Sequence, residues 1–128
     1  MVSITEKDAS LLIQLYQIYD QHRDALLWFL HKLAVTDYDD YKKKYPGTSK
    51  ERNYFTTVCG FFELSGVLVT RGILDEGLYF DLFNVRPFWE KAKQIVSGMR
   101  KDRPHIYENF ELLYNKRKIW AKRRRTSI

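Results

Sequence analysis

Apolar residues recur at three- and four-residue steps along most of the chain, the spacing that places them on one side of an α-helix. The first such stretch runs from Leu11 to Leu33 and ends in the series Leu26, Phe29, Leu30 and Leu33. Thr5 with Asp8 three residues later is typical of a helix start. We therefore predict one long amphipathic helix through Leu11–Leu33, with its beginning near Thr5.

Further helices are marked by capping residues at their starts and by glycine or proline at their ends. The markers are, in chain order, Asp37 and Pro46–Gly47 around a short helix, Thr48 or Ser49 and Gly72 around a long one, Asp75 before a short helix to Phe83, Pro87 in the first turn of the next helix, and Pro104 at the start of the last. No stretch alternates with a period of two. We predict an all-α fold, a compact bundle of three to four main helices plus two short helices.

The composition is typical of one globular domain. The chain has 128 residues, of which 45% are hydrophobic and 30% charged, so it can bury a core without metal or disulfides. A single cysteine excludes an intramolecular disulfide and favours a reducing, cytoplasmic location. Neither a secretory signal nor a membrane-spanning segment is expected from the apolar pattern.

The positive charge is concentrated near the C-terminus. Residues 116–125 hold seven cations and no acid, so this segment accounts for the net charge of +6. We divide the chain into a single helical domain, residues 1–115, and a basic C-terminal tail, residues 116–128, that continues the last helix. The candidate binding residues are Lys116, Arg117, Lys118, Trp120, Lys122, Arg123, Arg124 and Arg125.

Several roles fit this tail. It could bind the phosphate backbone of a nucleic acid, with Trp120 stacking on a base. It could also bind anionic lipid or an acidic groove of a protein, or be a solvated appendage without a partner. Tyr38, Tyr41 and Tyr45 with Lys42–Lys44 form a second aromatic and basic cluster, for which we predict packing against the bundle. A position of this cluster on the same side as the tail would favour nucleic acid.

No residue pattern predicts a metal, a cofactor or a catalytic nucleophile. His22, His31 and His105 lack the spacing of metal ligands, and the chain has no phosphate-binding or dinucleotide-binding loop. We expect Cys59 to be buried in the middle of a helix, with a raised pKa and little reactivity. No metal site and no cofactor are predicted.

Glu63 and Glu111 each lie beside apolar residues on a predicted helix, which makes them candidate buried polar groups. Two carboxylates that face one cavity could perform acid–base catalysis. The structural alternative is a bond to an arginine (Arg71, Arg86 or Arg100) or hydrogen bonds from tyrosine or tryptophan side chains. Gly60 and Gly66 lie in the same helix as Glu63, where we expect close approach of another helix or an aromatic ring to explain them.

The segment Tyr54–Glu76, with Phe80-Asp-Leu-Phe, Phe88-Trp-Glu-Lys and Tyr107-Glu-Asn-Phe-Glu-Leu-Leu, resembles a family of small all-helical proteins of bacteria and phages, catalogued as a domain of unknown function. The similarity covers roughly residues 50–114. Many members of that family carry an N-terminal membrane helix, which this chain does not show. The resemblance implies a helical fold and a recurring acid at Glu63, and it assigns no catalytic residue.

These observations favour a non-enzymatic helical interaction module, an adaptor or regulatory protein that binds another macromolecule with help from the cationic tail. A protein partner is expected first, and a homodimer through the long first helix is compatible with its wide apolar stripe. The alternatives are a nucleic-acid-binding protein of low specificity and an enzyme that uses Glu63 and Glu111. A membrane partner is not expected.

Overall fold

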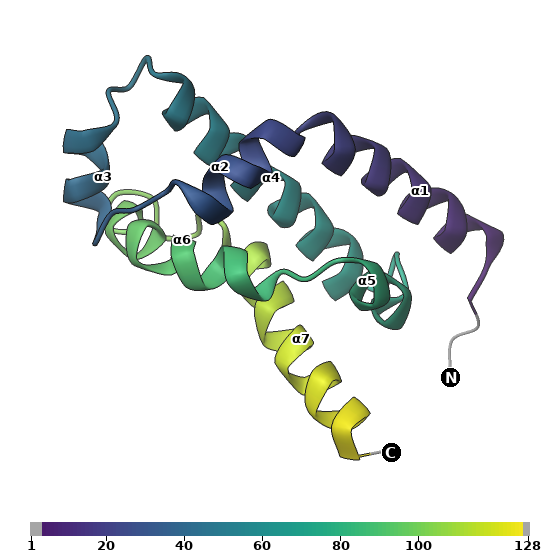
Figure 1. The fold of residues 1–128 in the computed structure, drawn as a ribbon. Helices are drawn as coiled ribbons and strands as arrows, with labels where there is room; N and C mark the ends of the chain where they lie inside the picture. The colour runs from purple at the N-terminus through teal and green to yellow at the C-terminus, as the bar shows by residue number, and fades with distance from the viewer. Residues whose placement is uncertain (1–3, 127–128) are drawn as a thin grey trace.

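The computed structural model describes residues 4–126, with side chains as far as Arg124. This part of the chain folds into seven helices and contains no strand (Figure 1). Their bounds are α1 (Glu6–Gln21), α2 (Arg23–His31), α3 (Tyr38–Lys44), α4 (Lys50–Thr70), α5 (Glu76–Leu82), α6 (Arg86–Met99) and α7 (Glu108–Thr126). The all-α prediction is confirmed, and four of the helices have 14 or more residues.

The predicted single helix through Leu11–Leu33 is wrong, because the chain breaks at His22. This residue has φ −108° and ψ 27°, outside the helical region, and separates α1 from α2. The two helices have different neighbours, since α1 packs on α4 and α5 while α2 packs on α4 and α6. A continuous straight helix could not follow both surfaces, and the sequence has no glycine or proline here to announce the break.

Most helix starts follow the predicted capping residues. Thr5 and Asp8 form a reciprocal capping box, and the side chains of Asp37, Ser49 and Asp75 each accept a backbone N–H of the first turn. Asp8 also joins two distant elements, because its second carboxylate oxygen accepts the N–H of Asp75 at 2.9 Å. Gly72 ends α4 with φ 72°, a left-handed conformation that favours glycine.

The predicted start of the last helix at Pro104 is also wrong. The chain forms turns up to Tyr107, which has φ 56°, and α7 begins at Glu108. Arg100 stabilises these turns, since its Nε donates to the carbonyl of Ile106 at 3.1 Å.

The core is built largely from aromatic rings, and all eight phenylalanines of the chain are buried. Phe62 on α4 lies at the centre, with ring centroids 4.6 Å from Phe88 on α6 and 5.3 Å from Phe110 on α7. Tyr41 and Tyr45 are buried as well, which confirms that the α3 tyrosines pack against the bundle. The high aromatic content of the sequence is therefore used mainly in the core.

Helix α4 is the central helix, in contact with α2 on one side and α7 on another. Gly66 permits the close approach of α7, because an added Cβ would collide with the backbone of Asn109. Gly60 does not follow this explanation: it is exposed and has nothing within 4 Å of such a Cβ. Among the described helices, none combines the length and apolar character needed to cross a bilayer.

Candidate functional site

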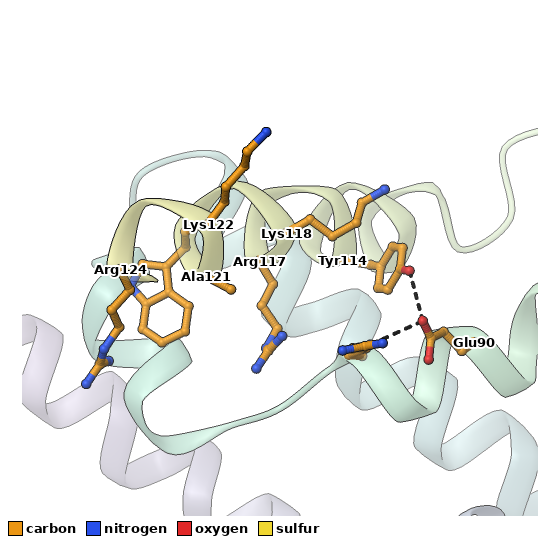
Figure 2. A pocket seen from close by; sticks show the side chains of 9 residues that line it. Glu90, Tyr114, Arg117, Lys118, Ala121, Lys122 and Arg124 are labelled. Carbon is orange, nitrogen blue, oxygen red and sulfur yellow. Dashed lines mark hydrogen bonds and ion pairs between the residues drawn. The ribbon is translucent and has the colours of Figure 1, made fainter. Parts of the chain in front are cut away.

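A groove of about 720 Å³ lies beside the C-terminal half of α7 and the beginning of α6 (Figure 2). Its lining consists of Arg86, Glu90, Tyr114, Arg117, Lys118, Trp120, Ala121, Lys122 and Arg124. Five of these nine residues are cations and one is an acid. We call this feature the α7 groove. Its charge and its concave shape make it the candidate functional site of the described chain.

The helical geometry of α7 sorts the tail cations onto different sides. Arg117 and Arg124, seven residues apart, extend together on one side of α7, whereas Lys118 and Lys122 project from another side at the rim (Figure 2). Lys116 does not line the groove and forms an ion pair with Glu76 of α5 at 3.8 Å. A run of cations in sequence thus becomes several distinct surfaces in the fold.

The tail is not a separate appendage of free cations. Helix α7 continues without a break to Thr126, as predicted, and Arg124 forms an ion pair with Asp81 of α5. Trp120 packs on Phe80 of α5 with ring centroids 5.4 Å apart. Trp120 and Arg124 are therefore attached to α5, although the ion pair of Arg124 is largely exposed to solvent. The proposed division at residue 115 falls inside α7 and stays a prediction.

The Trp120 ring is covered by neighbouring side chains, whereas an aromatic residue that stacks on bases has an open ring face. Besides Phe80, the guanidinium carbons of Arg124 and Arg117 lie over its ring, 5.0 and 5.9 Å from the centroid. The side chain is partly buried. Its observed contacts are those of an anchor that holds α7 on α5 and orients two arginines.

Glu90 occupies the α6 wall of the groove and joins it to α7. Its Oε2 accepts a hydrogen bond from Arg86 Nε at 3.3 Å and another from the Tyr114 hydroxyl at 3.2 Å (Figure 2). Desolvation raises the pKa of Glu90, but the hydrogen bonds from Arg86 and Tyr114 outweigh it and lower the pKa overall. The carboxylate is therefore charged at neutral pH and already bound to groups of this protein.

Arg117 lies deeper in the groove than the other tail cations. Its Nε is shielded from solvent and has no hydrogen-bond partner within the described part of the chain. Desolvation, followed by the charge of Arg86, lowers the pKa of Arg117. Arg86 and Arg117 thus line the same groove, and no carboxylate of the described residues is hydrogen-bonded to Arg117.

Sequence reasoning identified part of this lining. The structure brings together the predicted residues Arg117, Lys118, Trp120, Lys122 and Arg124. It adds Arg86, Glu90 and Tyr114, which the sequence did not assign to a site; the four-residue spacing of Arg86 and Glu90 was the available signal. Arg123 does not line the groove. The side chain of Arg125 lies outside the described part of the structure.

Glu63 and Glu111 have separate structural partners. Glu63 binds the beginning of α7: its carboxylate accepts the backbone N–H groups of Asn109 and Phe110, each at 3.0 Å, and the Asn109 amide at 2.8 Å. The predicted arginine or tyrosine partner is therefore wrong for Glu63. Glu111 binds Arg100 at 2.6 Å, one of the arginines named from the sequence. Neither the lining of the α7 groove nor that of another described pocket brings the two carboxylates together.

Cys59 is fully buried, as expected, and desolvation raises its pKa well above the ordinary value. His22 lies at the junction of α1 and α2, His31 in the last turn of α2, and His105 in the turns before α7. Among residues 4–124, no three histidine, cysteine or acidic side chains are grouped so as to hold a metal ion.

The second basic cluster lies away from the α7 groove. Tyr38 of α3 packs on Gly98, at the C-terminal end of α6, whereas Arg86 of the groove is at the N-terminal end of α6. Figure 1 accordingly shows α3 far from the C-terminal half of α7. The two clusters do not form one continuous basic surface, so this test gives no added support for nucleic acid.

One family model matches the chain, over residues 4–117, and its description is "Domain of unknown function (DUF4760)". The chain belongs to this family. The match to DUF4760 is wider than the resemblance found over residues 50–114 and contains both α6 and the first half of α7. Neither the curated proteins nor the solved structures gave a match to this DUF4760 chain. A bacterial or phage origin stays a prediction.

Proposed function

We propose that this DUF4760 protein is a non-enzymatic helical interaction module whose α7 groove binds an anionic segment of another macromolecule. The observation that carries the proposal is the lining of the groove, with five cations against one carboxylate, although one of the cations, Arg124, is paired with Asp81 of α5. That carboxylate, Glu90, is already hydrogen-bonded to Arg86 and Tyr114. The remaining positive charge in a concave surface attracts a negatively charged partner.

Nucleic acid is the partner class that we favour for this groove. Three of the five cations are arginines, whose planar forks match the oxygen geometry of phosphate. The aromatic side chains of Tyr114 and Trp120 line the same surface and hold cations over their rings, Lys118 on Tyr114 and two arginines on Trp120. An acidic segment of a protein is the competing partner.

The non-enzymatic part of the proposal is supported by the bonds of Glu63 and Glu111 to other groups of the fold. A cytoplasmic location is also part of the proposal.

The experiment is a fluorescence anisotropy titration of the protein with two labelled ligands at low salt, a 20-nucleotide single-stranded oligo(dT) and an oligoglutamate peptide. The groove variant is Lys118→Gln/Lys122→Gln. The matched control is Lys32→Gln/Lys43→Gln, which removes the same charge from two exposed positions, one just after α2 and one on α3. We expect about a tenfold loss of oligo(dT) affinity in the groove variant and less than about threefold in the control.

The outcomes separate the partners. Binding of the peptide but not of oligo(dT) would leave an interaction module with an acidic protein partner and overturn the choice of nucleic acid. Failure to bind either ligand, or equal losses in the groove variant and the control, would overturn the proposed groove.

A further inference from the structure

Arg117 has more hydrogen-bonding capacity than its surroundings satisfy. Its Nε is shielded from solvent without an acceptor in the described part of the chain, and its guanidinium lies over the Trp120 ring at 5.9 Å. An arginine in such a position is oriented before any ligand arrives, because packing restricts its rotamers. Nε is closed to a ligand as it is to solvent, but the terminal nitrogens of Arg117 have no hydrogen bond within the described residues, and they are the donors that an external oxyanion in the groove can reach.

Arg86 presents a second guanidinium to the same space. Its Nε donates to Glu90 at 3.3 Å, and its terminal nitrogens, on a largely exposed side chain, have no hydrogen bond within the described residues. Arg86 is also the first residue of α6, whose first turn contains no acid, and its backbone N–H donates to the Asn84 side-chain oxygen at 3.2 Å. The positive end of this helix therefore adds to the charge of the two arginines.

We infer that Arg86 and Arg117 form a phosphate subsite within the α7 groove, a closer description of the ligand that rests on the proposed function. The ligand group is a phosphodiester of the nucleic-acid backbone. A phosphate group offers several oxygens to two guanidinium forks at once, and charge-assisted bonds of this kind are stronger than those of neutral donors. A single bound anion would also relieve the repulsion between the two cations, which contributes to the lowered pKa of Arg117.

Phosphate is favoured over a partner's carboxylate by the tetrahedral arrangement of its oxygens. One carboxylate already binds the Nε side of Arg86 and the Tyr114 hydroxyl. A second carboxylate would offer its two oxygens in one plane to two arginines that come from different helices. A phosphodiester also has two anionic oxygens, but they lie on a tetrahedral phosphorus, out of plane with its two ester oxygens, and can contact two guanidinium groups that do not share one plane.

The first test compares variants in oligo(dT) binding, with circular dichroism melting curves to confirm that each variant folds. Arg117→Gln and Arg117→Lys are compared with Lys118→Gln at the groove rim and with Arg103→Gln, an exposed arginine in the turns before α7. We expect at least a tenfold loss for Arg117→Gln and nearly as large a loss for Arg117→Lys, since lysine keeps the charge but lacks the fork. Lys118→Gln should lose a few-fold and Arg103→Gln less than twofold.

Wild-type affinity in Arg117→Lys, or equal losses in Arg117→Gln and Lys118→Gln, would overturn the subsite while the proposed function stands.

A second experiment does not use nucleic acid. It follows the arginine Nε–H signals in ¹H–¹⁵N NMR spectra during titration with inorganic phosphate or with acetate at equal ionic strength. We expect the Arg117 signal to shift with phosphate and not with acetate. Equal shifts with both anions would contradict a phosphate-selective site, whereas a selective shift without oligo(dT) binding would reject the proposed partner and retain the subsite.

Discussion

The carboxylate of Glu63 on α4 accepts the backbone N–H of Phe110 on α7 at 3.0 Å, so a residue 47 positions earlier caps the last helix. The same oxygen accepts the N–H of Asn109. The first N–H groups of a helix have no partner within the helix and favour negative charge. Glu63 accepts these N–H groups and places a negative charge at the start of α7. It thereby fixes α7 on α4, which in turn positions the α7 groove.

Replacement of Glu63 by alanine should therefore destabilise the protein. We expect a loss of about 1.5–3 kcal/mol in the free energy of unfolding, the range for hydrogen bonds to a charged group. Urea denaturation followed by circular dichroism measures it. The matched control is Glu108→Ala in the first turn of α7, an exposed acid whose removal should cost less than about 1 kcal/mol. Equal losses in the two variants would contradict the capping role.

The two glycines of α4 should respond in opposite directions to substitution by alanine. Gly66→Ala places a methyl group against the Asn109 backbone, which cannot move without separating α4 from α7. We expect a loss of about 1–3 kcal/mol from this overpacking. Gly60→Ala adds a methyl group in open space on an exposed helix position and should stabilise by about 0.5–1 kcal/mol. A loss of stability in Gly60→Ala would show that an unseen contact or role requires this glycine.

Asp8 should make stability depend on acidity. Hydrogen bonds from the backbone of Thr5 and Asp75 lower the pKa of this carboxyl in the folded state. The contribution of the Asp8 carboxylate to the free energy of unfolding is therefore complete above its pKa in the unfolded chain, about 3.9. It is lost as the pH falls through the lower pKa of the folded state. The thermal midpoint of Asp8→Asn should lie below that of the wild type at pH 7, and the gap should narrow below about pH 4. Asp102→Asn, at an exposed turn position, should leave the midpoint almost unchanged at both pH values.

Removal of the tail should cost stability, because the tail is packed on the bundle. A chain that ends at Asn115 lacks the contact of Trp120 with Phe80 and the ion pair of Arg124 with Asp81. We expect a loss of roughly 1–3 kcal/mol, mostly from the aromatic contact, since exposed ion pairs contribute little. Chemical denaturation of this truncation and of Trp120→Ala should give similar shifts. An unchanged unfolding midpoint in both would restore the picture of an independent appendage.

Local signals account for what could be predicted of the fold. The caps at Thr5, Asp37, Ser49 and Asp75 use side chains that bond within three residues, so the sequence carries the whole interaction. The break at His22 depends on which neighbours α1 and α2 meet, and the start of α7 depends on Glu63, 46 residues before Asn109. Such tertiary causes leave no mark at the position where the helix begins or ends.

The candidate site was likewise predictable only where its residues lie close together in the sequence. The cations Arg117, Lys118 and Lys122 were evident from the charge of the tail. Their partners Arg86 and Glu90 belong to α6, and the packing of α6 beside α7 brings them into the same groove. The distribution of the tail cations over different sides of α7 follows from helical geometry once its packing is known.

The most direct test of the central claim is the salt dependence of oligo(dT) binding for the wild type and for Lys118→Gln/Lys122→Gln. If the groove cations displace counterions from the strand, log K should fall with log salt at a slope of roughly −0.7 for each phosphate contact. Two lost contacts should then make the slope shallower by about 1.4. Parallel slopes in the two proteins, or binding that is insensitive to salt, would contradict the account of the α7 groove as an anion-binding surface.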